Sequence, residues 1–142
     1  MFKKRSKAIA LLLMAASFQA CTTQRLSLKA NQRLVGIWQN VKDPASFITY
    51  TEDGHFYNSH KDGDNQVITH SGNYKVIGDD AYLLDITYEL PNRKYALKDR
   101  QYINHYVFGK DLKSVKLSGV VYGKSGSDTL RWEENMVKVN TL

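Results

Sequence analysis

Short clusters of turn-forming residues interrupt the chain at close intervals, and this punctuation limits the available folds more than any other feature. The clusters are Asp43-Pro44, Glu52-Asp53-Gly54, 61–65, Gly78-Asp79-Asp80, Pro91-Asn92, Gly109-Lys110-Asp111 and 123–128. The segments between them are rich in Val, Ile, Thr, Tyr and Phe, which favour strands, and none has the 3.6-residue periodicity of an amphipathic helix. Many short strands joined by tight turns predict an antiparallel sandwich or barrel rather than alternating strands and helices.

The segments predict eight consecutive strands, at residues 34–41, 46–51, 55–60, 66–77, 81–90, 100–108, 113–122 and 128–139. Eight strands joined in order by tight loops fit an up-and-down barrel, which closes on itself and leaves no edge strand. A chain of 142 residues is long enough for one such domain and too short for two. We therefore expect a single all-β antiparallel barrel over residues 34–142, with an interior that side chains fill or that holds one small ligand.

Alternation along the strands predicts which side chains face the interior. In residues 81–90 the predicted inward set is Tyr82, Leu84, Ile86, Tyr88 and Leu90. The opposite face carries the carboxylates of Asp85 and Glu89, which we expect to face solvent. In residues 113–122 the predicted inward set is Val115, Leu117, Gly119 and Val121. Residues 100–108 leave two inward sets open, either Tyr102, Tyr106 and Phe108 or Ile103, His105 and Val107.

The first twenty residues have the pattern of a secretory signal, with basic residues 1–7, an apolar run at 8–16 and the small residue Ala20 directly before Cys21. This resembles a bacterial lipoprotein signal, which implies cleavage after Ala20 and acylation of Cys21, and the box Phe18-Gln19-Ala20-Cys21 is similar to those of Bacteroidetes lipoproteins. The alternative is an ordinary signal peptide followed by an incidental free cysteine. Residues 21–33 are polar and are expected to form a flexible tether between an acylated Cys21 and the barrel.

The residues around Cys21 also bear on location. Thr22, rather than Asp, follows the cysteine, and no acidic cluster comes after it. The resemblance therefore implies a cell-envelope protein attached through lipid on Cys21 to the outer membrane and facing the periplasm.

The charge distribution argues against a nucleic-acid partner. The chain carries a formal net charge of +6, but four of its basic residues, Lys3, Lys4, Arg5 and Lys7, lie in the predicted signal, which contains no acid. The remaining residues carry a net charge of +2. A domain so close to neutral lacks the basic surface that a polyanion requires.

The residues that could carry chemistry do not form a catalytic or metal-binding pattern. The four histidines lie at positions 55, 60, 70 and 105, and no strand carries two at the spacing of a chelate. Lys61-Asp62-Gly63-Asp64-Asn65 is similar to the start of a calcium loop, but Gly72 stands at the twelfth position from Lys61, where the bidentate Glu would be, so a hairpin turn is favoured. No nucleophile–base pair or phosphate loop is present in the sequence, so we expect no enzyme, no cofactor and no metal.

Three short motifs carry a family resemblance. Leu34-Val35-Gly36-Ile37-Trp38 contains Gly-x-Trp in the first predicted strand, residues 48–56 are similar to the hairpin that follows it, and Ser71-Gly72-Asn73-Tyr74 is similar to the Gly-x-Tyr of the fourth strand. Residues 33–140 thus resemble the lipocalin-like (calycin) domains of small Bacteroidales lipoproteins. The resemblance implies that Trp38 plugs the closed end of the barrel and that Arg131, on the last strand, packs across its ring.

The tyrosines and one histidine suggest where a ligand would bind. Six tyrosines could line one interior, and a cavity with water or an amphipathic ligand satisfies their hydroxyls more easily than a dry core does. His70 is grouped by alternation with Ile68, Tyr74 and Val76 on a face expected to be interior. The predicted ligand-binding residues are Tyr82, Tyr88, Tyr106 and His70. We expect non-catalytic binding or carriage of a small, partly apolar ligand, with a protein-interaction module, either an envelope assembly factor or an enzyme inhibitor with a filled barrel, as the alternative.

Overall fold

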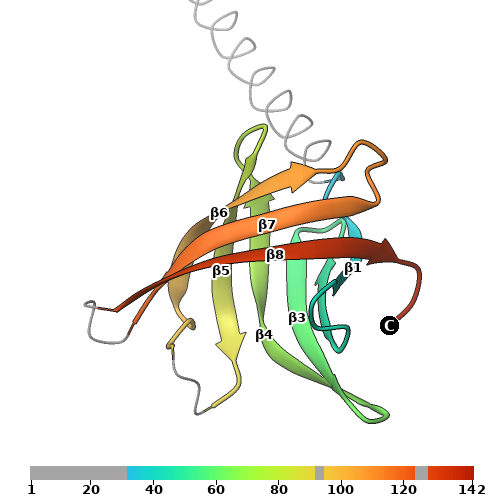
Figure 1. Ribbon diagram of the computed structural model, residues 1–142. Helices are drawn as coiled ribbons and strands as arrows, with labels where there is room; N and C mark the ends of the chain where they lie inside the picture. The colour runs from blue at the N-terminus through green and yellow to red at the C-terminus, as the bar shows by residue number, and fades with distance from the viewer. Residues whose placement is uncertain (1–31, 92–94, 124–127) are drawn as a thin grey trace, which may run out of the picture.

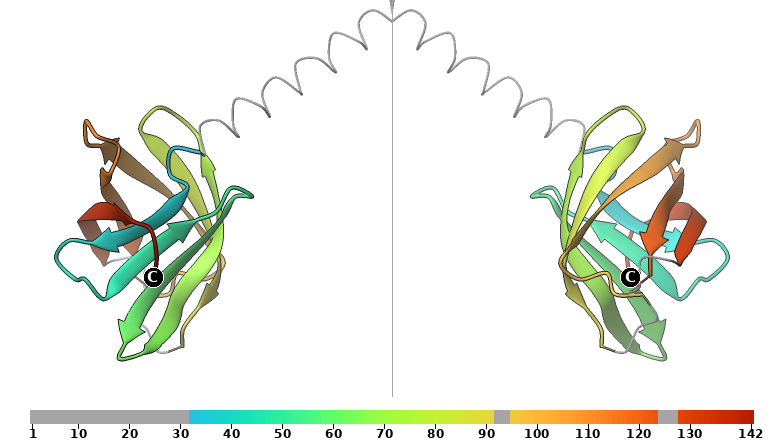
Figure 2. Two further views of the ribbon diagram at one scale, coloured as in Figure 1. Left: turned by 90° about the vertical axis from the view of Figure 1, so that its right-hand side faces the viewer. Right: turned by 90° about the vertical axis from the view of Figure 1, so that its left-hand side faces the viewer.

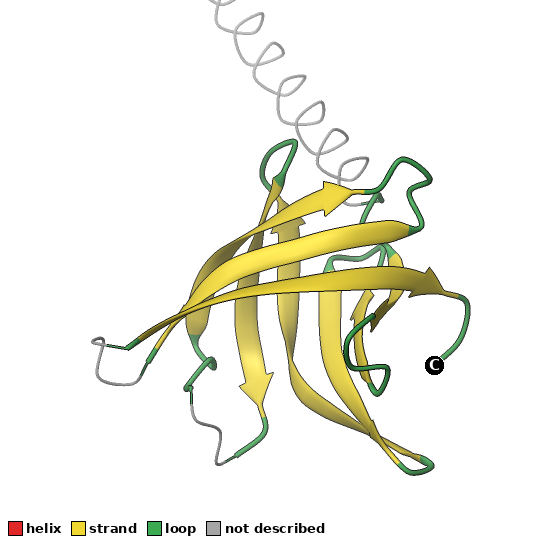
Figure 3. Cartoon of the chain, in the orientation of Figure 1, coloured by secondary structure: helices red, strands yellow, loops and turns green. Residues whose placement is uncertain are grey.

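A computed structural model of the protein describes residues 32–91, 95–123 and 128–142, and these residues form eight strands and no helix (Figure 1, Figure 3). The strands are β1 (Gly36–Asn40), β2 (Ser46–Tyr50), β3 (His55–Asp62), β4 (Asn65–Val76), β5 (Ala81–Glu89), β6 (Arg100–Phe108), β7 (Ser114–Tyr122) and β8 (Thr129–Val139). Each strand pairs antiparallel with the next, and β8 pairs with β1, so the sheet closes. The predicted all-β up-and-down barrel is confirmed. The predicted signal peptide and Cys21 lie outside the described residues.

The up-and-down order places successive hairpins at alternate ends of the barrel. The β4–β5 hairpin lies at the top of Figure 1 and the β3–β4 turn at the bottom, and Figure 2 shows the same separation from two further sides. We call the end with the β2–β3, β4–β5 and β6–β7 hairpins the packed end, and residues 32–35 also lie there. The opposite end, with the β1–β2, β3–β4, β5–β6 and β7–β8 hairpins, is the cavity end.

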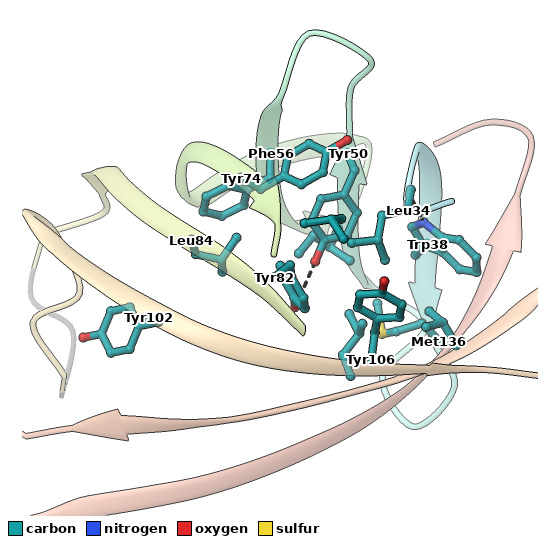
Figure 4. Packing of buried hydrophobic residues seen from close by; sticks show 14 of the residues in the cluster. Leu34, Trp38, Tyr50, Phe56, Tyr74, Tyr82, Leu84, Tyr102, Tyr106 and Met136 are labelled. Atoms are coloured by element: carbon teal, nitrogen blue, oxygen red, sulfur yellow. Dashed lines mark hydrogen bonds between the residues drawn. The ribbon is translucent and has the colours of Figure 1, made fainter. Parts of the chain in front are cut away.

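Large aromatic side chains fill the packed end (Figure 4). Trp38 is fully buried, and its indole Nε1 donates a hydrogen bond of 2.7 Å to the carbonyl oxygen of Leu34. This bond holds the segment before β1 across the barrel end, where Leu34 is itself fully buried. The ring centroids of Tyr50 and Tyr74 lie 4.9 Å apart in an edge-to-face arrangement, which is a favourable aromatic geometry.

The tyrosine hydroxyls at the packed end have partners nearby. Tyr74 donates to the carbonyl oxygen of Thr51 at 2.7 Å, and Tyr106 donates to that of Gly78 at 3.1 Å. Tyr50 donates to the hydroxyl of Tyr82 at 3.1 Å. The β2–β3 and β4–β5 connections therefore supply acceptors that let these buried phenols pack without loss of hydrogen bonding.

A β-bulge in β5 reverses the side-chain alternation that the sequence predicts there. Gly72 pairs with Ile86 and Ser71 pairs with Tyr88, which leaves Thr87 as an extra residue. Ile86, which precedes the extra residue, is buried, whereas Tyr88, which follows it, is 45% exposed. The prediction that Tyr88 faces the interior is wrong, because one extra residue exchanges the two faces of a strand.

The same bulge explains a second correction at the end of β5. Glu89, which was expected to face solvent, is partly buried, and its Oε2 accepts hydrogen bonds from the backbone N–H groups of Leu97 (2.9 Å) and Lys98 (3.2 Å). This carboxylate thus fastens the β5–β6 connection to the barrel.

A further bulge lies between β3 and β4. Asn58 pairs with His70 and Ser59 pairs with Ile68, so Thr69 is the extra residue. Ile68 is consequently 41% exposed. The prediction that Ile68 and His70 share the interior face is therefore wrong. The turn is also tighter than the expected loop at 61–65, because Asp62 already pairs with Asn65.

Burial along β6 and β7 shows which of their side chains face the interior. In β6, Tyr102, Asn104 and Tyr106 are buried while Ile103 and Val107 are exposed, which decides between the two inward sets. In β7, Val115 and Leu117 are buried as predicted, and Val121 packs against the core.

Candidate functional site

A cavity of about 260 Å³ occupies the middle of the barrel and its cavity end. Its apolar walls come from four strands and the β5–β6 connection, and they are Ile48, Leu84, Ile86, Leu97, Leu117, Val121 and Leu130. An apolar cavity of about 150 Å³ is enough to admit benzene, so this space accommodates a small organic molecule. Concave, mostly apolar sites with a few polar groups are the usual form of small-molecule sites.

Two residues of this lining each carry a polar atom that is buried without a hydrogen-bond partner among the described residues. The atoms are the hydroxyl of Tyr102 and Oδ1 of Asn104, in side chains that are 5% and 3% exposed as whole residues. Leaving a buried polar group unpaired costs about 1–3 kcal/mol. A ligand or water in the cavity that offers hydrogen-bond donors would remove this cost.

Glu134 supplies the negative charge of the cavity. It is partly buried on β8, and neither a hydrogen bond nor an ion pair within the described part of the chain holds its carboxylate. Burial, with a smaller contribution from the charge of Asp43, raises the pKa of Glu134 above its ordinary value. Desolvation has the same effect on the neighbouring phenol and raises the pKa of Tyr82 to about 12, although hydrogen bonds with Tyr50 and Asn104 oppose the rise.

The sheet loosens beside this cavity, between β6 and β7. Backbone pairing of these strands extends only from His105↔Ser118 to Phe108↔Val115, while β6 itself begins at Arg100. Across the unpaired stretch, Nη1 of Arg100 donates a hydrogen bond of 3.0 Å to the carbonyl oxygen of Tyr122.

Trp132 lines both the interior cavity and a groove of about 390 Å³ on the outer face of β6, β7 and β8. A Cβ at Gly119 would overlap Asn104 Oδ1 and lie 3.0 Å from Cε2 of Trp132. Glycine at this position therefore leaves the space that the Asn104 and Trp132 side chains occupy at the loosened part of the sheet.

The predicted ligand-binding residues fall into three places. Tyr82 and His70 line the cavity. Tyr106 is buried at the packed end, where its hydroxyl already has an acceptor. Tyr88 lies on the outside because of the β5 bulge. His70 forms an edge contact with the ring of Phe56, at 6.0 Å between centroids, and its Nδ1 lies 3.2 Å from Oγ1 of Thr69.

The predicted pair at the barrel plug needs a correction. Trp38 is fully buried, but Arg131 is exposed and lines the outer groove, because alternation along β8 turns its neighbour Trp132 inward. Lys138, which pairs with Trp38 across the β1–β8 ladder, takes the position over the indole instead, with its Nζ 5.3 Å from the ring centroid. The last strand therefore supplies a cation to Trp38, as expected, but from a residue seven positions later.

Gly36 explains why the first strand needs a glycine before Trp38. Its φ is +135°, a conformation that L side chains rarely adopt, and a Cβ there would collide with Cε of Lys138. The absence of a side chain lets Lys138 reach across, where its Nζ donates to the carbonyl oxygen of Val35 at 2.8 Å.

Sequence reasoning missed Asn104, Glu134 and Trp132 as cavity residues. Asn104 shares the tyrosine face of β6, so choosing that face would have found it. Counting back in steps of two from the buried Met136 along β8 reaches Glu134 and Trp132, but Val137 and Leu130 on opposite faces give no apolar stripe to start from.

Within residues 32–91, 95–123 and 128–142, no group of three or more His, Cys, Asp and Glu side chains is arranged to hold a metal ion. The same residues include no helix that is both long and apolar enough to span a membrane.

Comparison with known proteins adds no family assignment. No protein-family model matches the chain, and no curated protein matches it significantly.

Proposed function

We propose that the protein binds or carries a small, partly apolar molecule inside its barrel and that it does so without catalysis. The observation that carries this proposal is the contrast within one interior: apolar walls enclose about 260 Å³ beside two buried polar atoms, Tyr102 Oη and Asn104 Oδ1, that lack partners among the described residues. Most of the described residues that line the cavity are apolar, which supports binding of a molecule with an apolar part.

Titration with a neutral lipophilic fluorophore, N-phenyl-1-naphthylamine, tests the binding proposal. We expect saturable fluorescence enhancement at micromolar dye, which corresponds to about −8 kcal/mol and is attainable for an apolar molecule of this size. Val121→Phe, which places a ring in the cavity, should weaken binding about tenfold or more by occupying the dye's volume. Tyr88→Ala is the control, because Tyr88 lies on the outer face and its loss should leave dye affinity unchanged.

Absence of saturable binding would contradict the proposal. It would favour the alternative, a protein-interaction module, whose support is an exposed apolar strip on β6 formed by Ile103 (58% exposed) and Val107 (61% exposed). Equal loss of binding in Val121→Phe and Tyr88→Ala would mean that the dye binds outside the cavity.

We also propose that the protein is a lipocalin-like lipoprotein anchored in the cell envelope through acylated Cys21. The Ala20-Cys21 pattern supports the anchor, and the Gly36–Trp38 motif at the packed end of a closed eight-stranded barrel supports the lipocalin-like resemblance. Lys138, where the resemblance implies an arginine at Arg131, is a departure from that pattern.

Cys21→Ser tests the anchor. Expressed as the full chain in a bacterial host with an outer membrane, the wild type should fractionate with outer membranes and face the periplasm, and Cys21→Ser should move to the soluble periplasmic fraction. Unchanged membrane partition of Cys21→Ser would remove the lipoprotein proposal while leaving the ligand-binding proposal intact.

A further inference from the structure

The charged side chains among the described residues of the cavity lining are not balanced in sign. Among the described residues that line the cavity, Glu134 is the one carboxylate and none is Lys or Arg. His70 is the other side chain there that could carry a charge near neutral pH, and its Nδ1 already faces Thr69 Oγ1 at 3.2 Å. A bound molecule that carries a positive charge would therefore meet an opposite charge that no protein cation in this lining neutralises.

The uncharged polar groups in the lining match the same kind of ligand. Asn104 Oδ1 can only accept hydrogen bonds, and the Tyr102 hydroxyl oxygen can accept one as well. Asn104 hydrogen-bonds Tyr82, and the charge of Glu134 acts on the same Tyr82 phenol, so the acceptor and the carboxylate lie around one side chain. A group with several N–H donors beside Tyr82 would supply a hydrogen bond to Asn104 Oδ1 and an opposite charge to Glu134.

Aromatic rings add a third element. Tyr82, Tyr102 and Trp132 all line the cavity. The faces of such rings attract cations. Carboxylate, acceptor and aromatic rings together form a setting suited to an ammonium group with an apolar body.

We propose that the cavity selects a small protonated amine, whose ammonium group is neutralised by Glu134 and donates to Asn104 Oδ1 while its apolar part lies against Leu84, Ile86 and Leu117. This inference rests on the proposed function and specifies the class of ligand. It also accounts for the position of Glu134, since a carboxylate held at an apolar cavity without a partner is costly in the empty barrel and compensated in the loaded one.

Three probes of matched shape test the charge preference by isothermal titration calorimetry of the full chain at neutral pH: 2-phenylethylamine, 2-phenylethanol and phenylacetate. The amine should bind about tenfold or more tightly than the alcohol. The reason is that a hydrogen bond to a charged group is roughly twice as strong as one between neutral groups. Phenylacetate should bind most weakly, since its charge has the same sign as that of Glu134.

Two variants locate the preference. Glu134→Gln should reduce the affinity for 2-phenylethylamine to that for 2-phenylethanol and leave the affinity for the alcohol unchanged. Glu133→Gln is the matched control, because Glu133 faces outward and pairs with Lys116 at 3.0 Å, and it should keep the full amine preference. Urea melts of both variants check that the barrel remains folded.

The outcomes separate the inference from the function it rests on. If amine and alcohol bind equally, or if Glu134→Gln keeps the amine preference, the amine inference is overturned and the ligand-binding proposal stands. If neither the three probes nor N-phenyl-1-naphthylamine binds the wild type, both are overturned. Loss of the preference in Glu133→Gln as well as Glu134→Gln would assign it to overall charge and overturn the specific role of Glu134.

Discussion

The packed end and the cavity end use the same kinds of side chain to different effect. At the packed end, Trp38, Tyr74 and Tyr106 each donate to a backbone carbonyl oxygen supplied by that end. At the cavity end, the hydroxyl of Tyr102 and Oδ1 of Asn104 are equally buried, and no described residue pairs with them. Among the described residues, hydrogen bonding is thus complete for these side chains of the packed end and incomplete for Tyr102 and Asn104 at the cavity end.

Truncating a tryptophan at each end should give the largest difference between them. Trp38→Ala should lower the free energy of unfolding by about 3–5 kcal/mol, because it removes a fully buried ring and leaves a cavity in a packed core. Trp132→Ala should cost about 1–2 kcal/mol, since its ring is only partly buried and already borders open space. Urea melts followed by far-UV circular dichroism measure both, and equal losses would remove the distinction between the ends.

A substitution at Gly72 tests the bulge that separates the two regions of β5. A Cβ at Gly72 would overlap the carbonyl oxygen of Asp85, so Gly72→Ala should destabilise the barrel by about 2–3 kcal/mol through forced movement of β5. Gly78→Ala is the control, because a Cβ there has no atom within 4 Å and the change should stay within about 0.5 kcal/mol. A Gly72→Ala variant as stable as Gly78→Ala would mean that β4 and β5 do not approach closely at the bulge.

The sequence predicts the strand boundaries well but the inward-facing side chains only in part. The predicted strand boundaries agree with the observed ones to within two residues, and most of them lie beside clusters of Gly, Asp, Asn and Pro, which reflect local backbone geometry directly. Alternation succeeded along β7, where Val115 and Leu117 face inward as predicted. Alternation failed at Tyr88, which follows the extra residue of the β5 bulge, and at Ile68, which precedes the extra residue of the β4 bulge. A bulge arises from how two strands fit together, so neither strand's own pattern reveals it.

The candidate site was less predictable than the fold for a related reason. Tyr82 and His70 were placed in the lining, but Glu134 and Trp132 depend on the face that β8 turns inward, and polar and apolar residues occur on both of its faces. The cation over Trp38 was expected on β8, yet Arg131 and Lys138 are an odd number of residues apart and must face opposite sides. Choosing between them requires the β1–β8 register, which is a long-range property.

Removing one hydroxyl at each end gives a smaller and sharper comparison. Tyr50→Phe should cost about 1 kcal/mol, because its hydroxyl donates to Tyr82 at 3.1 Å and the Tyr82 oxygen then loses a buried donor. Tyr102→Phe should be neutral or slightly stabilising, since its hydroxyl has no partner among the described residues of the empty barrel. Equal losses in chemical denaturation would show that the Tyr102 hydroxyl has a partner in solution, and the comparison between the ends would fail at that residue.

The smallest expected effect is a pH-dependent one at Glu134. Burial raises the pKa of Glu134, so the folded protein holds its proton more tightly than the unfolded chain does. As pH rises above about 4.5, the unfolded chain releases that proton first, and the folded state loses stability until its own raised pKa has been passed. Glu134→Gln has no such proton to lose.

The variant should therefore match the wild type at pH 4 and exceed it modestly in unfolding free energy at pH 7, whereas Glu133→Gln, which loses only an exposed pair with Lys116, should show no such gain. Urea melts of the three proteins at both pH values measure the difference. A gain for Glu134→Gln that is the same at pH 4 and pH 7 would contradict the role of its charge, because a packing effect does not titrate. A gain confined to neutral pH would mean that the charge of Glu134 lowers the stability of the empty cavity end. The packed end carries no comparable cost, because the buried phenols of Tyr50 and Tyr74 remain protonated throughout this range.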